Sequence, residues 1–355
     1  MPQFCTLFLG TLAMSHYTAP SQILERQQYL LQHKKILIAG EAEDNYPILL
    51  AQHCKQVQLF TTHYGYYQQM QPHTQLQCYF GVELEQSLEA DILILYWPKA
   101  KKEAAYLLAM LLPRLALGTE VIVVGENRSG IKSIEKLFTA YGNITKYDAA
   151  RRCSFYHGVY QHQAKPFVLQ EWFSHYTMQH KEHSLTIYAL PGVFSQNELD
   201  FGSRLLLDSL PVLSGKVLDV GCGAGVLGAV TAKLNPDIEL HLCDVNALAL
   251  RSTEETLKAN QLTAHVFASD VYSHVDNQYH FIISNPPFHS GLDTNYQATE
   301  QLISQAKTHL TPNGQLWIVA NRFLPYPDLI ERIFGQCTTK QQTNKFSIYQ
   351  AQKKR

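Results

Sequence analysis

Residues 217–228 read VLDVGCGAGVLG, and this stretch decides the fold of the chain. An apolar strand runs into a turn with three glycines, and a helix is expected from about 226 to 234. Glycines at such a turn let the backbone approach a ligand closely and expose N–H groups at the start of the helix. Residues 223–228 also satisfy the G-x-G-x-x-G fingerprint, so this turn alone leaves nicotinamide and flavin cofactors open.

The same plan occurs twice along the chain. Residues 35–40 (KILIAG) correspond to residues 216–221 (KVLDVG), each a buried strand that ends at a glycine. Three further correspondences keep the same order: 91–98 with 279–286, 118–127 with 314–321, and 153–156 with 346–349. Short apolar strands that alternate with longer helical stretches indicate β-α units on a mainly parallel sheet. We predict an α/β protein made of two tandem Rossmann-like, doubly wound domains that arose by internal duplication.

The domain boundary is expected near residue 165, with domains at 14–165 and 166–355. A length of 355 residues suits two domains, each with its own core. Residues 161–211 are rich in aromatic side chains and too apolar for a flexible linker. We expect this segment to pack on the second domain.

Carboxylates follow the next two strands after the glycine turn. Asp244 stands about twenty residues past the glycines, where a carboxylate can accept hydrogen bonds from ribose hydroxyls. Its alternative interpretation is a solvated strand end. Asp270 can accept from an adenine amino group, and a helix cap explains it almost as well. The predicted cofactor-binding residues are Asp219, Gly221, Gly223, Gly225, Asp244, Ser269 and Asp270.

Residues 284–288 read SNPPF and follow the apolar strand 281–283, a loop that hydride transfer does not need. Two prolines remove two N–H donors, so the loop presents acceptors. The Asn285 side-chain oxygen and the Pro286 carbonyl can hold the hydrogens of an NH2 group, so that its lone pair points at a methyl donor. Phe288 can stack on a base. The predicted catalytic residues are Asn285, Pro286, Pro287 and Phe288; alone, such a string is usually a rigid turn.

With these motifs in place, the second half resembles a class I methyltransferase. Residues 190–195 (LPGVFS), 199–207, 284–291 and 320–326 resemble the bacterial 16S ribosomal RNA guanine-N2 methyltransferases of the RsmC family, as does 149–158. The resemblance implies S-adenosyl-L-methionine as methyl donor and the N2 amine of a guanine in 16S rRNA of the small (30S) subunit as target. Alternatives are another Asn-Pro-Pro-Phe enzyme acting on adenine N6 or on a protein glutamine, and an inactive RNA-binding scaffold.

The first half departs from a working methyltransferase. After its first strand it has GEAED at 40–44, and its fourth strand ends in YWPK at 96–99. We expect this degenerate domain to bind no cofactor and to serve stability and substrate docking. The candidate docking residues, which can meet phosphates or stack on a base, are Tyr96, Trp97, Lys99, Lys101 and Lys102. A solvated lysine run explains the three lysines equally well.

Composition limits the remaining possibilities. The formal net charge is −1, so any RNA must be recognised by a local patch. The seven cysteines form no C-x-x-C pair, which suits a reducing cytoplasm and gives no thiolate metal site. The apolar residues 1–13 lack a preceding basic region, so secretion is not expected, and Met14 is the expected start after disordered first residues. We expect a cytoplasmic monomer without metal or membrane contact.

Overall fold

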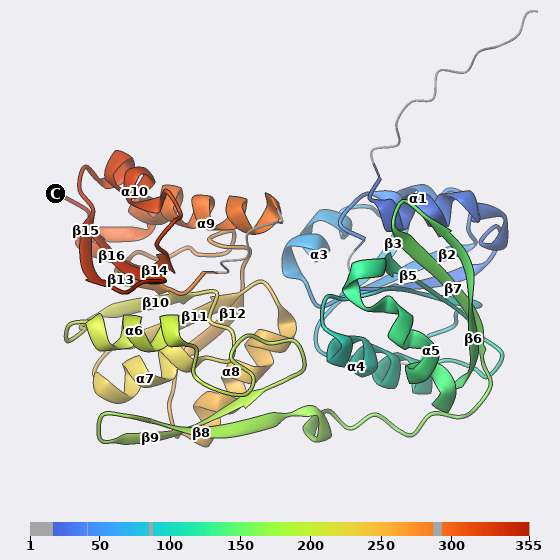
Figure 1. The fold of residues 1–355 in the computed structure, drawn as a ribbon, viewed down its shortest axis with the longest axis horizontal. Helices are drawn as coiled ribbons and strands as arrows, with labels where there is room; N and C mark the ends of the chain where they lie inside the picture. The colour runs from blue at the N-terminus through green and yellow to red at the C-terminus, as the bar shows by residue number, and fades with distance from the viewer. Residues whose placement is uncertain (1–16, 41, 85–87, 287–292, 355) are drawn as a thin grey trace, which may run out of the picture.

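The computed structural model describes residues 17–40, 42–84, 88–286 and 293–354. Within them the chain forms two α/β domains with a β-hairpin between them in sequence (Figure 1). The expected start at Met14 lies outside the described residues. In the described part of the chain, no helix is both long enough and apolar enough to span a bilayer.

The first domain holds a seven-stranded sheet in the order β3-β2-β1-β4-β5-β7-β6. Strands β1 to β5 pair in parallel, whereas β7 is antiparallel to both β5 and β6. The strands are β1 (Lys35–Ala39), β2 (Gln56–Thr61), β3 (Leu76–Phe80), β4 (Ile92–Tyr96), β5 (Glu120–Glu126), β6 (Gly142–Ala150) and β7 (Cys153–Tyr160). The helices are α1 (Ala19–Arg26), α2 (Tyr46–Leu50), α3 (Tyr64–Met70), α4 (Lys101–Leu111) and α5 (Ile134–Leu137).

The second domain repeats this topology in the order β12-β11-β10-β13-β14-β16-β15. Its strands are β10 (Lys216–Val220), β11 (Glu239–Asp244), β12 (His265–Ala268), β13 (Tyr279–Ser284), β14 (Leu310–Asn321), β15 (Thr338–Gln342) and β16 (Phe346–Gln352). Its helices are α6 (Phe201–Ser209), α7 (Val226–Leu234), α8 (Ala247–Ala259), α9 (Asp293–Ala306) and α10 (Tyr326–Phe334). The shared strand order confirms the predicted pair of doubly wound domains.

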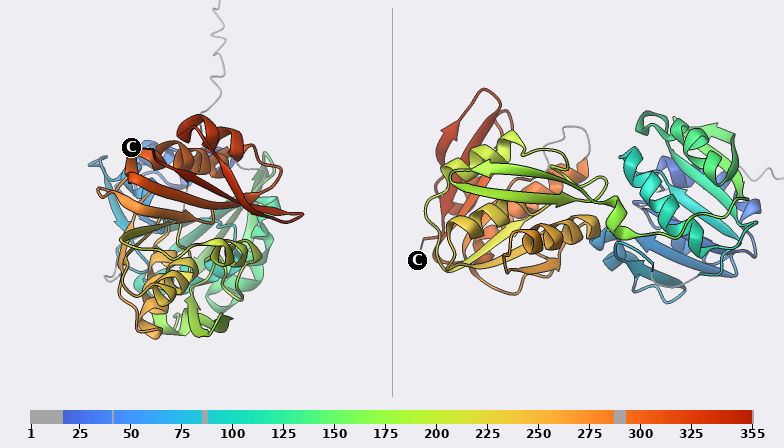
Figure 2. Two further views of the ribbon diagram at one scale, coloured as in Figure 1. Left: turned by 90° about the vertical axis from the view of Figure 1, so that its left-hand side faces the viewer. Right: turned by 90° about the horizontal axis from the view of Figure 1, so that it is seen from below.

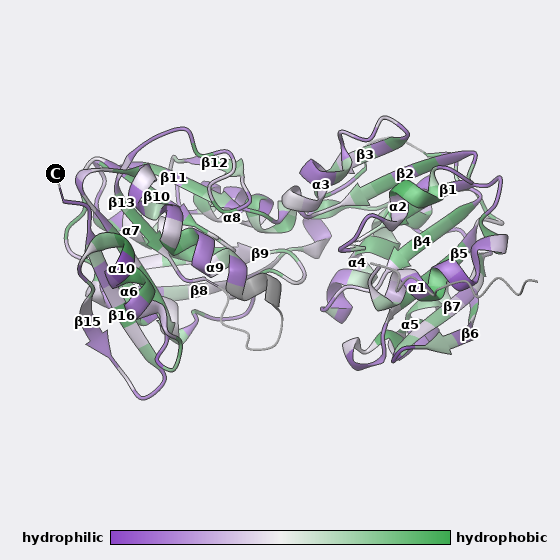
Figure 3. Cartoon of the chain, turned by 90° about the horizontal axis from the view of Figure 1, so that it is seen from above, coloured by the Kyte–Doolittle hydropathy of each residue, from purple (hydrophilic) through white to green (hydrophobic). Residues whose placement is uncertain are grey.

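The central strands of both sheets are buried because helices cover both faces, and Figure 3 shows these strands as the hydrophobic centre of each domain. In the second domain, α6, α7 and α8 contribute to one apolar cluster, and α9 and α10 contribute to the other. Parallel strands buried on both faces are expected to be near-continuously apolar, as β1 and β13 are. Because helices cover both faces of each sheet, the loops at the carboxyl ends of the parallel strands are the expected place for a ligand-binding site.

The segment between the domains packs on the second domain, as predicted. It forms the hairpin of β8 (Ser174–His180) and β9 (His183–Ala189), which lies against α8 (Figure 2). The backbone N–H groups of Tyr188 and Leu190 donate to the hydroxyls of Thr256 and Ser252, each at 3.0 Å. Next to β8, the Trp172 ring contacts the Tyr106 ring of α4 at 5.4 Å between centroids. The segment therefore also touches the first domain.

Candidate active site

The turn after β10 adopts the backbone that its glycines predict. Gly221, Gly223 and Gly225 have φ angles of 72°, 57° and 78°, in the left-handed region where side chains are disfavoured. A Cβ at Gly221 would meet no atom of the described residues within 4 Å, so they leave open space beside the backbone there. Gly225 immediately precedes α7, which begins at Val226 as expected and whose first N–H groups have no acceptor within the helix. The turn has the room and the donors that a bound cofactor needs.

Asp219 lies under this turn and is fully buried. Its Oδ2 accepts a hydrogen bond of 3.0 Å from the N–H of Gly228, which ties β10 to α7. Its Oδ1 is buried and has no hydrogen-bond partner in the part of the chain that the structure describes. Burial raises the pKa of this carboxyl to about 7, and the nearby Asp244 adds to the increase. A buried acceptor without a partner is costly, and a cationic ligand in the site would offset that cost.

Asp244 joins two turns at the carboxyl end of β11. Its Oδ2 accepts from the N–H of Gly223 and its Oδ1 accepts from the N–H of Asn246, both at 2.9 Å. Burial raises the pKa of Asp244, while these backbone bonds oppose the increase. Each carboxylate oxygen can accept a second hydrogen bond, so the ribose role expected for this residue is compatible with its contacts.

Ser269 and Asp270 form the turn that follows β12. The Ser269 N–H donates to the Asp244 carbonyl at 3.1 Å, and the Ser269 hydroxyl donates to the Val271 carbonyl at 2.9 Å. This buried hydroxyl shapes the turn. No helix starts at Asp270, so the helix-cap alternative for that carboxylate does not apply. Strand β12 pairs with β11 in parallel, and this brings Asp270 to the same edge as Asp244.

Asn285 directly follows β13, and its amide is held in one orientation. The Nδ2 group donates to the Asp200 carboxylate at 3.0 Å and to the Ser203 hydroxyl at 2.7 Å. An ionised carboxylate only accepts hydrogen bonds, so the nitrogen must lie on that side of the amide. The opposite atom, Oδ1, is buried and has no hydrogen-bond partner among the described residues. This orientation is compatible with the acceptor role that the sequence predicts for Oδ1.

The neighbouring motif residues are only partly described. Pro286 is buried, whereas Pro287 and Phe288 lie outside the described residues. Just before the motif, the Ser284 hydroxyl donates to the Val220 carbonyl at 2.8 Å. This bond joins the end of β13 to the end of β10, so the loop of Asn285 and the glycine turn start from adjacent positions.

Asp200 and Ser203 are the residues that sequence reasoning did not assign to the site. Asp200 caps α6 by accepting from the Ser203 N–H at 2.9 Å, and the same oxygen accepts from Asn285. The sequence does carry a signal for the start of α6. Asp200 is an acidic residue before an apolar helical run, and the polar Ser203 follows three positions later, a pattern typical of a helix N-terminus. Its second partner, 85 positions away, has no local signature.

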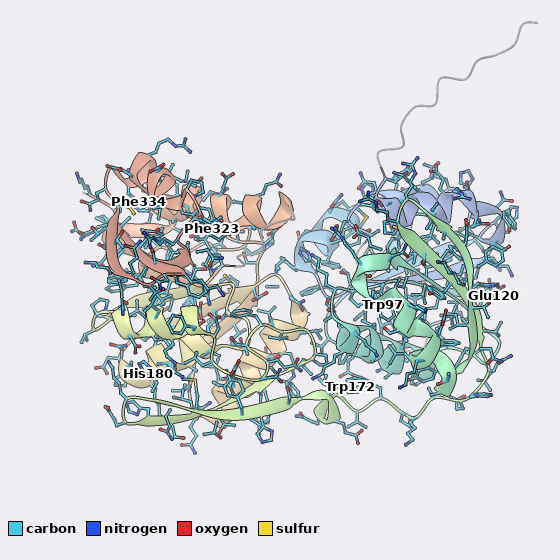
Figure 4. The ribbon with its side chains drawn as sticks, viewed as in Figure 1. Trp97, Glu120, Trp172, His180, Phe323 and Phe334 are labelled. Atoms are coloured by element: carbon cyan, nitrogen blue, oxygen red, sulfur yellow. The ribbon has the colours of Figure 1, made fainter. Side chains whose placement is uncertain are left out.

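In the first domain, the prediction that Tyr96 and Trp97 stack on a base is wrong. Tyr96 is 4% exposed with its hydroxyl 2.9 Å from the Ser21 hydroxyl, and Trp97 is 8% exposed with its Nε1 donating to the Ser129 carbonyl at 3.1 Å. Figure 4 shows Trp97 inside the domain. Both side chains belong to the domain core because α1 and the loop after β5 cover the end of β4. Lys99, Lys101 and Lys102 are exposed, so only the lysines are available for docking.

The first domain also lacks the open turn of the second. Gly40 corresponds to Gly221, but a Cβ there would lie 2.7 Å from the Tyr96 carbonyl oxygen, where Gly221 has open space. The nearby Asp44 carboxylate accepts from the Thr18 N–H at 2.6 Å and from the Ser21 hydroxyl at 3.1 Å. The chain's own α1 region thus occupies part of the edge where a ligand would bind.

Comparison with known proteins places both halves in one class. Residues 21–176 match the family described as methyltransferase small domain N-terminal, and residues 184–350 match the methyltransferase small domain. The fold and the site therefore define a tandem methyltransferase-domain protein.

Curated relatives identify the family. A protein of Vibrio cholerae is 56% identical over 96% of this chain and 100% of its own length, and one of Vibrio vulnificus is 58% identical with the same coverage. Each is named ribosomal RNA small subunit methyltransferase C, and this chain belongs to that family. The solved structure of the T. thermophilus 16S rRNA N2 G1207 methyltransferase, RsmC, in complex with AdoMet and guanosine has the same fold. Its TM-score is 0.82 at 22% identity, covering 96% of this chain and 93% of that one.

The raised pKa of Asp219 predicts how stability depends on pH. Its pKa is about 7 in the folded chain against 3.8 ordinarily, so the folded state retains a proton that the unfolded chain releases. The resulting stabilisation of the folded state is complete at pH values below 3.8, and it is lost as the pH rises through about 7. In the absence of cofactor, we expect the free energy of unfolding of the wild type to fall across this window relative to Asp219→Asn.

Urea unfolding at a series of pH values measures this difference. The exposed Asp237 offers a matched control, and Asp237→Asn should follow the wild-type curve. If Asp219→Asn also runs parallel to the wild type, the buried carboxyl has no raised pKa.

Proposed function

We propose that this chain transfers a methyl group from S-adenosyl-L-methionine to the N2 amine of a guanine in 16S rRNA. The observation that carries the proposal is the orientation of Asn285: two acceptors hold its Nδ2 group, and its Oδ1 has no partner within the described part of the chain. Family membership and the activity of the T. thermophilus protein, a 16S rRNA N2 G1207 methyltransferase, support this choice of substrate. We further propose that the enzyme acts as a cytoplasmic monomer on the small (30S) subunit.

The catalytic domain is proposed to span residues 166–355, with the first domain at 14–165. S-adenosyl-L-methionine supplies a sulfonium methyl group that an amine can attack. Asp219 would face its cationic part and Asp244 its ribose, while the glycine turn leaves space beside the backbone. The proposed cofactor-binding residues are Asp219, Gly221, Gly223, Gly225, Asp244, Ser269 and Asp270.

The proposed catalysis is mainly orientation of a weak nucleophile. The guanine N2 lone pair is delocalised into the ring, so both N–H bonds must be held in a pose that directs the lone pair at the methyl group. Asn285 Oδ1 and the Pro286 carbonyl would accept those two bonds, with Pro287 and Phe288 completing the loop. When bound, S-adenosyl-L-methionine would supply the methyl group: the new N–C bond would replace the methyl–sulfur bond, S-adenosyl-L-homocysteine would leave, and N2 would release one proton to water. Positioning of this kind can supply most of the rate enhancement.

Exposed aromatic rings at the same edge suit a splayed-out RNA base. Phe194, Phe201 and Phe323 are 52%, 56% and 71% exposed, which is unusual for phenylalanine. Phe201 adjoins the Asp200 that holds Asn285, and Phe323 follows the end of β14 (Figure 4). Phe194 lies beside the glycine turn, because a Cβ built on Gly223 would be 3.7 Å from the carbonyl oxygen of Phe194. Single-stranded RNA is bound by stacking on such rings.

The proposed reaction is tested with purified protein, 30S subunits and S-adenosyl-L-methionine carrying a tritiated methyl group. We expect label in one 16S fragment, and mass spectrometry of its nucleosides should give N2-methylguanosine. Label in N6-methyladenosine or in a protein glutamine would contradict the proposal. Naked 16S rRNA in a parallel reaction decides whether the assembled subunit is the substrate.

The role of Asn285 predicts a kinetic signature. Asn285→Ala should slow single-turnover methyl transfer about a hundredfold or more while leaving cofactor affinity nearly unchanged, because it removes the acceptor that orients the amine. Asp200→Asn keeps the shape of the side chain that accepts from Asn285 Nδ2, but its new NH2 group can face Asn285 and disturb the orientation of that amide. This variant should therefore also lower the single-turnover rate constant. A normal single-turnover rate for Asn285→Ala would end this mechanism.

The three lysines are proposed to dock RNA. Lys101 and Lys102 lie in the first turn of α4, where the helix dipole disfavours positive charge, so they do not serve helix stability. This first turn of α4 lies close to residues 192–194, which run beside the glycine turn of the second domain. A Cβ built on Gly192 would be 3.0 Å from Glu103 Oε2. The lysines are therefore on the side of the first domain that adjoins the site.

Replacing Lys99, Lys101 and Lys102 by alanine should raise the KM for RNA and leave cofactor affinity unchanged. The salt dependence of RNA binding should flatten by about one unit of slope for each phosphate that the variant no longer neutralises. Alanine at Lys132, Lys136 and Lys146, exposed on the same domain, is the matched control and should have little effect. Equal salt slopes for the two triple variants would remove the lysines from docking.

A further inference from the structure

The first domain touches the second at the residues that immediately follow Asp244. The Tyr64 N–H donates to the Val245 carbonyl at 2.7 Å, and the Ala247 N–H donates to the Thr62 carbonyl at 2.8 Å. His63 and Asn246 form an antiparallel bridge between these two bonds. In Figures 1 and 3, α3, which starts at Tyr64, lies next to the second domain. We call residues 62–65 the bridging segment.

The bridging segment also reaches the turn after β12. The Tyr64 hydroxyl lies 3.1 Å from His274 Nε2, and the two rings meet edge to face at 5.0 Å between centroids. The backbone N–H of His274 in turn donates to the hydroxyl of Ser269 at 3.1 Å. A Cβ built on Gly65 would lie 2.7 Å from Asp270 Oδ2, so Gly65 is in close contact with that carboxylate.

The contact pairs equivalent parts of the two domains. Residues 62–64 follow β2, and residues 245–247 follow β11, which holds the same place in the second sheet. Only one copy retains the carboxylate, because Asp244 ends β11 where Thr61 ends β2. After these two strands the first domain presents backbone groups to residues 245–247 and the Tyr64 side chain to His274, and the second domain presents the proposed ligand-binding residues.

We propose that the bridging segment is a structural part of the cofactor site, positioning Asp244 and Asp270 for the adenosine half of S-adenosyl-L-methionine. This inference rests on the proposed function, since it assumes that cofactor. Turns at a sheet edge are ordinarily mobile, and holding them in the binding geometry reduces the ordering cost of binding. The two bonds to Val245 and Ala247, together with the Tyr64–His274 contact, hold the turns on both sides of the adenosine position. The first domain contributes to cofactor affinity although its own glycine turn is lost.

Gly65→Ala in the full-length protein tests the proposal. Gly65 has no left-handed φ, so alanine fits its backbone, but the added Cβ must displace the Asp270 carboxylate. We expect the Kd for S-adenosyl-L-methionine, measured by calorimetry, to rise about tenfold. The Kd for 5′-methylthioadenosine, which lacks the amino-acid half, should rise by the same factor. The matched control is Gly81→Ala in the same domain, whose Cβ would lie an ordinary 3.7 Å from the Glu83 carbonyl.

A second variant and a stability measurement keep the outcomes distinct. Tyr64→Phe removes only the hydroxyl contact with His274 and should raise the same Kd about twofold to threefold, so it carries the test if Gly65→Ala does not fold. Thermal unfolding without ligand records any loss of stability. If both variants bind with wild-type affinity, whatever their unfolding temperature, the bridging segment only joins the domains and the inference is overturned. If the wild type binds neither ligand, the proposed function fails first.

Discussion

The carboxylate of Asp244 is the constraint on which the rest of the site depends. One oxygen holds the N–H of Gly223 and the other holds the N–H of Asn246, so a single side chain sets the relation between the glycine turn and the turn after β11. The Asp244 carbonyl also accepts from the N–H of Ser269, which brings in the third turn. Three loops that would otherwise move independently are joined at one residue. The carboxylate carries the energetic cost of burial in return for this geometry, as the raised pKa of Asp244 records.

The two domains show what duplication keeps and what it loses. Both retain the same strand order, because that order is maintained by buried apolar strands that tolerate exchange among Val, Ile and Leu. The edge of the first sheet has instead been filled from within, by the α1 region around Asp44 and by the Tyr96 carbonyl against Gly40. These internal contacts stabilise the loop edge of the first sheet. This filling is also why Tyr96 and Trp97, which follow one another at the end of β4, are core residues.

Most of the fold and the local motifs of the candidate site could be predicted from local sequence. The glycine turn, the start of α7 and the acceptor loop at Asn285 each depend on a few neighbouring residues with distinctive conformational preferences. Local sequence could not exclude that Asp270 caps a helix, because only the path of the chain after Asp270 shows that no helix begins there. The exposure of Trp97 was likewise undecidable, since burial at a strand end depends on segments that are distant in sequence.

By itself, the sequence determined the duplicated α/β plan, the order of the motifs and the family, because strand burial, glycine conformation and motif spacing are local properties. Only the tertiary structure decided the orientation of the Asn285 amide, which depends on Asp200 and Ser203, 85 and 82 positions away. It also decided that the first domain meets the second beside Asp244, through bonds between backbone groups. Backbone N–H and carbonyl groups are the same in nearly every residue, so no side-chain pattern announces such a contact.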